Sequence, residues 1–469
     1  MSIHSCGWVM TIFCTLIFID TFQTTASEPT FQVDFAEPIE PLRAVNGTNL
    51  WAPFALESFQ NSNEEVKRAR FPLVRLHDCP WDNYGQRLVD VHQIFGNLDA
   101  DPHNPENYYF KPTDDYIDRI IHDGGSKVLY RLGSSIEHTT EHYFTGPPAD
   151  PERYAEICAG IVRHYNHGWA NGFYWNIQYW EIWNEPDLCP QMWSNTDFRT
   201  YCDFYVTVAK RLHSEFPEIR IGGPGLTGAN LEKLGMLADA CRQANVPFDF
   251  CSWHSYAAVP EQLLDTPAQV RNLLDSKGFT KTELHLNEWH YFPAPWSEVH
   301  GLAGGAERRN FWRNAPEGIN GYDAAAFVGY VLSRWQDTPL DMGNYYATGL
   351  TTWGLIGPDA ELRKPYYTHI AFADLLEKYP MRVRTTDVPY VSLLGGIRGE
   401  RGRAIFVSCW KQNQERLEIA VRGVAPNGEV RIQRLDRDHN LTEETLTYTD
   451  GLLRIDNASG SFVLFIEWL

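Results

Sequence analysis

The chain has 469 residues, of which 43% are hydrophobic and 21% charged, and this balance excludes a wholly disordered or collagen-like protein. Sixty acidic against 40 basic side chains leave a formal charge of −20 at pH 7. Such an acidic surface disfavours nucleic acid or an anionic membrane as a partner, because phosphate groups bind to basic patches.

The N-terminal region carries an apolar run at residues 7–19, followed by small and polar residues up to Ala26. This pattern predicts a secretory signal peptide over residues 1–26, although no Lys or Arg precedes the run. The run is shorter than the ~20 residues that a membrane span needs, and no later uncharged run is long enough. We therefore expect a secreted or periplasmic protein that makes no membrane contact after the signal is removed.

Short strand-like runs alternate with longer amphipathic stretches through the middle of the chain. Such alternation favours a parallel sheet. Eight strand-like runs suit a (β/α)8 TIM barrel over residues 43–377, in the α/β class. A doubly wound sheet is the alternative, but no glycine-rich dinucleotide fingerprint follows the first run. The eight runs are 44–51, 71–77, 127–132, 179–184, 219–224, 248–256, 282–289 and 341–346.

Helix-like stretches fall between these runs, and some carry recognisable ends. Thr113 and Asp150 stand where N-cap residues belong, and Gly124 and Gly125 stand where a helix should stop. The clearest of these stretches are 113–125, 150–165, 196–216 and 323–335.

The pattern of apolar and polar residues changes after the barrel region. From residue 378 onwards, apolar and polar residues alternate with a period of two, and the runs are separated by turn sequences such as PNG and DHN. This pattern predicts a β-sandwich over residues 378–469. The segment 27–42, which contains FQVDF, is expected to join the sandwich as an edge strand.

Two glutamates stand at the ends of strand-like runs, each with aromatic neighbours. Glu185 lies in WEIWNEPD and Glu288 in LHLNEWHY. Active groups of a barrel gather at the carboxyl ends of its strands, and an acid among tryptophans has a raised pKa. Two such acids can supply the proton donor and the ionised carboxylate that glycosidic bond cleavage needs. A salt bridge or a loop cap is the structural alternative for either glutamate alone.

Two pairs of residues with i, i+2 spacing stand beside these acids. Arg75 and His77 share one side of the second strand-like run, so Arg75 could keep a carboxylate ionised and His77 could bond a sugar hydroxyl. His254 and Tyr256 repeat this spacing on the sixth run, where Tyr256 could orient Glu288 by a hydrogen bond. A salt bridge at the barrel end remains the structural alternative for Arg75.

Metal and serine chemistry find no support in the sequence. The run HLNEWH matches no zinc-protease motif, and on a strand His285 and His290 would point to opposite faces. No cysteine pair has C-x-x-C spacing, and no G-x-S-x-G motif is present. We therefore expect no metal and no cofactor.

The runs WEIWNEPD and NEWHY and the order of barrel then sandwich resemble clan A glycoside hydrolases, most of all family 39, which holds β-xylosidases and α-L-iduronidases. Further similar stretches are VRLHD (74–78), 108–133, WHSY (253–256) and 349–367. The resemblance implies a retaining hydrolase with Glu185 as the acid/base and Glu288 as the nucleophile. It further implies that substrate is bound by Arg75, His77, Asn184, His254, Tyr256, Tyr346 and Trp353.

The chain departs from the family pattern in two places. Where the family often has Trp at the end of the eighth strand, this chain has Tyr345 and Tyr346, and Asn287 stands before Glu288 where Thr is common. Both departures bear on which sugar is recognised, and they leave the resemblance to clan A unchanged.

The expected function is that of a secreted retaining exo-glycosidase of the β-xylosidase type, with an oligo- or polysaccharide as its substrate. One alternative is a clan A glycosidase of another specificity, such as an arabinosidase, galactosidase, iduronidase or endo-glycosidase. Another is a non-catalytic carbohydrate-binding barrel, which the presence of both glutamates disfavours.

Overall fold

The structure is a computed structural model that describes most of the chain from residue 31 to residue 469. The predicted signal peptide at residues 1–26 lies outside the described residues. Within 31–469 the description omits 52–61, 81–86, 138, 295–297, 299–306, 308–317, 350–352, 358, 387, 414–415 and 457–458.

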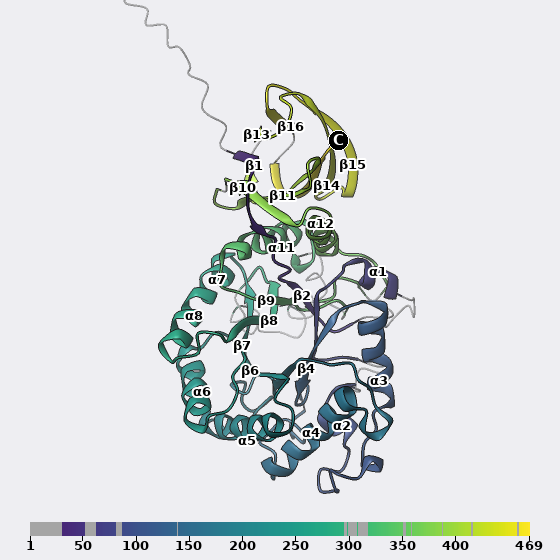
Figure 1. Ribbon diagram of the computed structural model, residues 1–469, viewed down its shortest axis with the longest axis vertical. Helices are drawn as coiled ribbons and strands as arrows, with labels where there is room; N and C mark the ends of the chain where they lie inside the picture. Colours follow the sequence, from purple (N-terminus) through teal and green to yellow (C-terminus); the bar gives the residue numbers. More distant parts are fainter. Residues whose placement is uncertain are drawn as a thin grey trace, which may run out of the picture.

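Eight parallel strands of the described chain close into a barrel, which Figure 1 shows end-on. Their order in the barrel follows their order in the sequence, and the first strand pairs with the last to close it. Each predicted run overlaps one of these strands, so the TIM barrel is confirmed. The strands are β2 (Asn46–Asn49), β3 (Leu73–Leu76), β4 (Lys127–Leu132), β5 (Tyr179–Ile182), β6 (Arg220–Leu226), β7 (Phe250–Ala257), β8 (Glu283–Tyr291) and β9 (Met342–Tyr345).

Helices surround the barrel and bury their apolar faces against its strands (Figure 1). The α-helices are α1 (Asn63–Arg68), α2 (Val91–Ile94), α3 (Lys111–Asp118), α4 (Pro151–His167), α5 (Arg199–Glu215), α6 (Leu231–Ala244), α7 (Glu261–Leu264), α8 (Thr266–Ser276), α11 (Tyr322–Arg334) and α12 (Lys364–Lys378). Among the described residues, no helix has the length and apolar character that crossing a bilayer requires.

The two predicted N-caps have different outcomes. The Asp150 carboxylate accepts a hydrogen bond from the backbone N–H of Arg153 at 3.0 Å, so its capping of α4 is confirmed. The prediction for Thr113 is wrong, because α3 begins at Lys111 and the Thr113 hydroxyl donates to the carbonyl of Leu88. Thr113 is buried, and its partner comes from a distant part of the chain.

Nine described strands form one curled, mostly antiparallel sheet around a second apolar core. This sheet, together with the barrel, confirms the expected fold class. Strand β1 pairs with β10 and with β13, so it lies inside the sheet and not at the expected edge. The strands are β1 (Phe31–Pro41), β10 (Met381–Thr385), β11 (Val391–Arg398), β12 (Gly402–Asn413), β13 (Arg416–Arg422), β14 (Gly428–Leu435), β15 (Asn440–Tyr448), β16 (Leu452–Asp456) and β17 (Ser459–Trp468).

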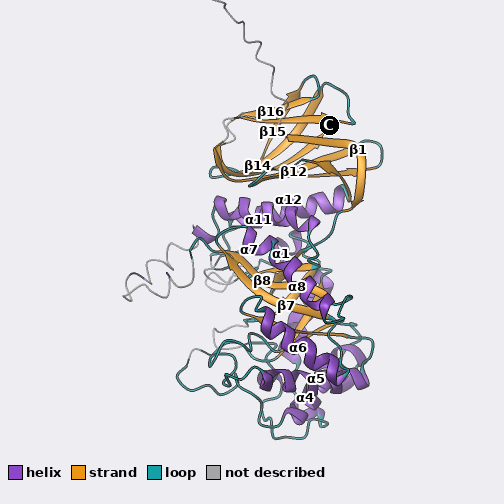
Figure 2. Cartoon of the chain, turned by 90° about the vertical axis from the view of Figure 1, so that its left-hand side faces the viewer, coloured by secondary structure: helices purple, strands orange, loops and turns teal. Residues whose placement is uncertain are grey.

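The curled sheet packs on α11 and α12, beside the barrel (Figure 2). Helix α11 is therefore covered on both sides, and its residues 324–333 are all buried. The Ser408 hydroxyl of β12 donates to the carbonyl of Ala326 at 2.6 Å. A Cβ at Gly329 would lie only 3.0 Å from that hydroxyl oxygen, so this glycine allows close approach of the sheet.

Candidate active site

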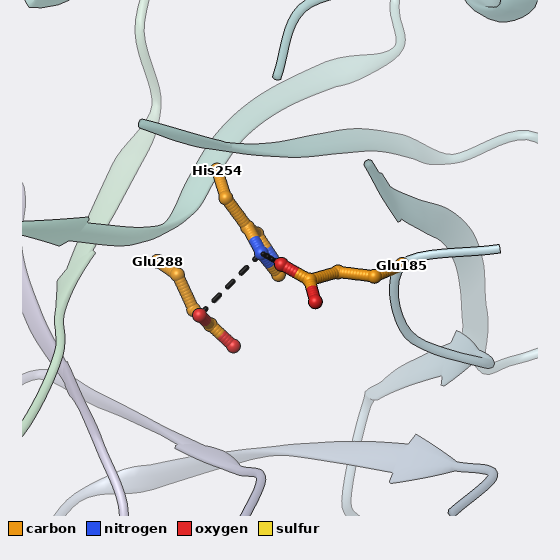
Figure 3. A group of neighbouring side chains, drawn as sticks. All are labelled: Glu185, His254 and Glu288. Atoms are coloured by element: carbon orange, nitrogen blue, oxygen red, sulfur yellow. Dashed lines mark hydrogen bonds and ion pairs between the residues drawn. The ribbon is translucent and has the colours of Figure 1, made fainter. Parts of the chain in front are cut away.

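The side chains singled out from the sequence converge at the carboxyl ends of the barrel strands. Arg75 comes from β3, Glu185 follows β5, His254 lies on β7 and Glu288 lies on β8. Figure 3 shows the two glutamates on either side of the His254 imidazole. One oxygen of each carboxyl group and one imidazole nitrogen lie within 4.8 Å of one another.

The turn that carries Glu185 has an unusual backbone. Trp183 has φ 74° and Glu185 has φ 45°, both in the left-handed region that non-glycine residues rarely adopt. The Glu185 N–H donates to the carbonyl of Gly225 at 2.9 Å, and the Glu185 carbonyl accepts from the N–H of Leu188 at 2.9 Å. These bonds hold the turn in place after β5.

Glu288 is held at both oxygens by buried donors. Its Oε1 accepts from Nη1 of Arg75 at 2.8 Å, and its Oε2 accepts from the Tyr256 hydroxyl at 2.8 Å. Burial raises the pKa of Glu288, while His254, Arg75 and the Tyr256 hydrogen bond act in the opposite direction. The sequence analysis expected both effects, a pKa raised by the apolar surroundings and lowered by Arg75, and burial is the larger of the two.

Glu185 is bonded to the neighbouring histidine. Its Oε1 lies 2.7 Å from Nδ1 of His254, and that nitrogen also lies 3.4 Å from Oε2 of Glu288. Burial, followed by the charge of Asp187, raises the pKa of Glu185 to about 8. Burial lowers the pKa of His254 to about 4, so its imidazole is neutral at neutral pH. The histidine expected to face a sugar thus also links the two carboxyl groups.

Arg75 is the centre of a fully buried network that sequence reasoning found only in part. Its Nε donates to Oε2 of Glu181 at 2.7 Å, and its Nη2 donates to Oδ1 of Asn184 at 2.6 Å. Glu181 also accepts from the Ser252 hydroxyl at 2.7 Å and from the Asn287 side-chain amide. Glu181 was missed, although a charged residue inside the apolar run WEIW was a visible signal.

A second group of polar side chains approaches the Glu288 oxygen that Arg75 bonds. His77 Nε2 is 3.7 Å from Oε1 of Glu288 and 3.6 Å from Oδ2 of Asp78. The same Asp78 oxygen accepts from the Tyr346 hydroxyl at 2.8 Å. Asp78 was not among the predicted site residues, although it directly follows the Arg75–His77 pair in VRLHD.

Aromatic side chains line the same side of the site. The Trp353 ring centre lies 5.3 Å from that of Tyr256 and 6.3 Å from that of Tyr346. The Tyr345 hydroxyl instead bonds Nε2 of His290 at 2.8 Å, whereas the Tyr346 hydroxyl bonds Asp78. Of the two tyrosines that end the eighth strand, Tyr346 is therefore the one beside the predicted site residues.

Glu185, His254 and Glu288 are also ligand types that a divalent cation can use. The site does not fit one well, because the charged guanidinium of Arg75 already lies 2.8 Å from Glu288 and would repel a cation. These neighbours instead suit a pair of carboxyl groups of which one is ionised, beside Arg75, and the other is protonated.

Residues 98–389 match the sequence model of a family described as glycosyl hydrolases family 39. The chain is 26% identical over 267 residues to a β-xylosidase of Geobacillus stearothermophilus, over 50% of this chain and 49% of that protein. It is 30% identical over 347 residues to a β-xylosidase of Caldicellulosiruptor saccharolyticus, over 66% of this chain and 63% of that protein. The chain thus spans about half of the first relative and under two thirds of the second.

Solved structures share the whole fold at low identity. A glucosidase from Croceicoccus marinus superposes with a TM-score of 0.74 and 21% identity, over 93% of this chain and 98% of that chain. A monomeric β-xylosidase from Caulobacter crescentus CB15 superposes with a TM-score of 0.69 and 15% identity, over 94% and 99% of the two chains. The family match covers more than half of the sequence, and the chain therefore belongs to glycosyl hydrolase family 39.

Proposed function

We propose that the protein is a retaining glycosidase that works by double displacement, with Glu185 as the acid/base and Glu288 as the nucleophile. One observation carries this proposal: an oxygen of each carboxyl group lies within 4.8 Å of the other. Retaining enzymes hold their two carboxyl groups about 5–5.5 Å apart, whereas inverting enzymes leave roughly 6.5–9.5 Å for a water molecule. The short separation supports retention.

The first displacement uses the two protonation states of the pair. Protonated Glu185 donates its proton to the glycosidic oxygen while the Glu288 carboxylate attacks the anomeric carbon. The bond to the leaving group breaks, the leaving group departs as an alcohol, and an ester joins the sugar to Glu288. The pKa of about 8 at Glu185 supports this role, since the acid keeps its proton at neutral pH.

The second displacement returns the enzyme to its starting state. Glu185, now a carboxylate, takes a proton from water, and the resulting hydroxide attacks the anomeric carbon and releases Glu288. Arg75 and Tyr256 donate to the Glu288 oxygens at 2.8 Å each, so they stabilise the carboxylate both before attack and as it leaves. His254 keeps Glu185 directed at the reacting bond.

The proposed substrate is a neutral oligo- or polysaccharide from whose end a β-linked xylose is removed. The two relatives named above are β-xylosidases, which supports this sugar. The sugar would be bound by polar groups of His77 and Asn184 and by the rings of Tyr346 and Trp353. Secretion is proposed on the apolar run at residues 7–19.

A panel of aryl glycosides tests the proposal. We expect the β-D-xyloside to react faster than the β-D-glucoside, β-D-galactoside, α-L-arabinofuranoside and α-L-iduronide. Proton NMR during the reaction should show β-xylose before its mutarotation. Early appearance of the α-anomer would contradict retention. If another glycoside reacted fastest, the proposed sugar would be wrong. If no glycoside reacted, the proposed glycosidase activity would be wrong.

A further inference from the structure

The loop that joins β4 to α4, residues 133–150, carries two large aromatic side chains in the open. Tyr143 is 68% exposed and Phe144 is 44% exposed, and they are neighbours among the nine exposed large hydrophobic side chains of the described residues. The Phe144 ring stacks on the His92 imidazole with ring centres 3.9 Å apart and planes 3° apart. Exposed aromatic rings that are held in place are typical of binding surfaces.

A single carboxylate holds this loop in shape. Both oxygens of Glu137 accept from the backbone N–H of Tyr143, and one of them also accepts from the N–H groups of Phe144 and Thr145, at 2.8–3.0 Å. The Thr145 hydroxyl donates to the same carboxylate at 2.7 Å. The two rings are thus presented by a fixed turn, so little conformational entropy would be lost when they bind a partner.

The same loop lies against the loop that carries Glu185. The N–H of Glu137 donates to the carbonyl of Gln191 at 3.5 Å. A Cβ at Gly146 would lie 2.9 Å from the hydroxyl oxygen of Ser194, so these two segments also touch further along. Both loops leave the barrel at the carboxyl ends of neighbouring strands, β4 and β5. The loop that carries the aromatic rings therefore lies beside the loop that carries Glu185.

We propose that His92, Tyr143 and Phe144 form an aromatic platform that binds the leaving-group side of an oligosaccharide. This inference rests on the proposed function, because Glu185 protonates the glycosidic oxygen and the leaving group must therefore extend past its loop. Flat rings stack on the apolar faces of sugar rings. The Tyr143 hydroxyl, which donates to Glu141 at 2.7 Å, adds a polar edge that suits hydroxyl-bearing rings better than an alkyl chain.

The test compares Phe144→Ala and Tyr143→Ala with the unchanged protein on two substrates. One is 4-nitrophenyl β-D-xyloside, whose leaving group is short, and the other is xylotetraose. We expect kcat/KM for xylotetraose relative to the aryl xyloside to fall about three- to tenfold, the range of one aromatic contact. Tyr174→Ala is the matched control, because Tyr174 is 79% exposed but precedes β5 at the opposite end of the barrel.

A binding measurement separates this inference from the proposed function. Xylotetraose is titrated calorimetrically into protein that carries Glu288→Ala, with and without each platform substitution. Binding that weakens three- to tenfold in the platform variants supports the platform even if no glycoside is cleaved. Unchanged binding, no binding at all, or an equal loss with Tyr174→Ala would overturn it. An equal fall in kcat/KM on both substrates would also contradict it.

Discussion

At the scale of single residues, the guanidinium of Arg75 is shared between two buried carboxylates. It lies 2.7 Å from an oxygen of Glu181 and 2.8 Å from an oxygen of Glu288. Removing one member of a buried ionic group leaves the others incompletely paired. Glu181 thus acts on the reaction as a positioning residue, through the place and charge of Arg75.

Glu181→Gln should therefore change the pH profile as well as the rate. Loss of a negative charge beside Arg75 favours the ionised form of Glu288, so the acidic limb of kcat/KM should move to lower pH. A displaced Arg75 should also lower kcat/KM by roughly 10- to 100-fold. Glu283→Gln is the control, because Glu283 pairs with Arg220 at the other end of the barrel. A fixed acidic limb in Glu181→Gln would refute the positioning role.

Glu185→Ala should separate substrates by their leaving groups. Poor leaving groups need a proton, so their kcat/KM should fall by about 10²–10⁴, whereas activated aryl glycosides should form the glycosyl-enzyme with much smaller loss. In the unchanged protein, activity on poor leaving groups should decline as the pH rises through about 8, because Glu185 then loses its proton. That limb should vanish in the variant. Equal losses on both substrate classes would argue against the acid/base assignment.

The sequence indicated some of these contacts and not others. The i, i+2 spacing placed Arg75 and Tyr256 on the correct sides of their strands, and both indeed donate to Glu288. The partners of Glu181 could not be predicted from the sequence. Its partners Arg75, Ser252 and Asn287 come from three other strands, which only the closed barrel brings together. The strength of burial at Glu288 is likewise a property of the assembled site.

At the scale of elements, a strand could be predicted where its burial gave the sequence a recognisable pattern of apolar residues. Barrel strands appeared as apolar runs because both of their faces are covered. Strand β15 carries a weak apolar signal, because its sequence NLTEETLTY is polar and mostly exposed. Strand β11 departs from the period of two for the opposite reason. It is buried between the second core and the helices α11 and α12, so it shows no alternation, and it contains two glycines.

One side chain from the segment before β2 reinforces the place where the first and last barrel strands pair. Arg43 donates through Nη1 to the carbonyl of Leu340 at 2.8 Å and through Nη2 to the carbonyls of Thr338, at 2.9 Å, and Trp335. These carbonyls precede β9, so Arg43 joins the approach to the first barrel strand to the approach to the last.

Arg43→Ala should lower the melting temperature by about 3 °C. The lost hydrogen bonds contribute roughly 3 kcal/mol to the free energy of unfolding, and in a chain of this size such a loss shifts the melting temperature only slightly. Circular dichroism during heating measures this. Arg384→Ala removes an exposed ion pair with Glu37 on the neighbouring strands of the sheet, and it should change the melting temperature by less than about 1 °C. Equal shifts in the two variants would show that Arg43 has no special part in closure.

At the scale of the whole molecule, the sheet supports the barrel from the side. It packs on α11 and α12, and Lys411 of β12 places its Nζ 2.9 Å from the hydroxyl of Tyr291, at the end of the strand that carries Glu288. The change from helix–strand alternation to period-two runs predicted this second part of the fold. Its docking on two helices could not be predicted, because it depends on small residues such as Gly329 that carry no local signal.

Export of the molecule is open to a direct test. The first residue of the exported protein should lie near Ser27, because the apolar run at residues 7–19 would be removed with the signal peptide. N-terminal sequencing reads this position. Leu16→Arg, which places a charge in the middle of the run, should keep the protein inside the cell. An exported protein that still begins at Met1 would contradict the prediction.

The left-handed backbone at Trp183 and Glu185 lowers the stability of the fold at the turn that carries the proposed acid/base. Each such residue destabilises the fold by about 1–3 kcal/mol, and the surrounding structure must compensate for it. Glycine adopts this conformation freely, so Glu185→Gly should lose activity on substrates with poor leaving groups and yet melt at a higher temperature than the unchanged protein. A lower melting temperature would mean that the bond to His254 outweighs the strain. Screens that select this enzyme for heat resistance alone would therefore tend to favour loss of its acid.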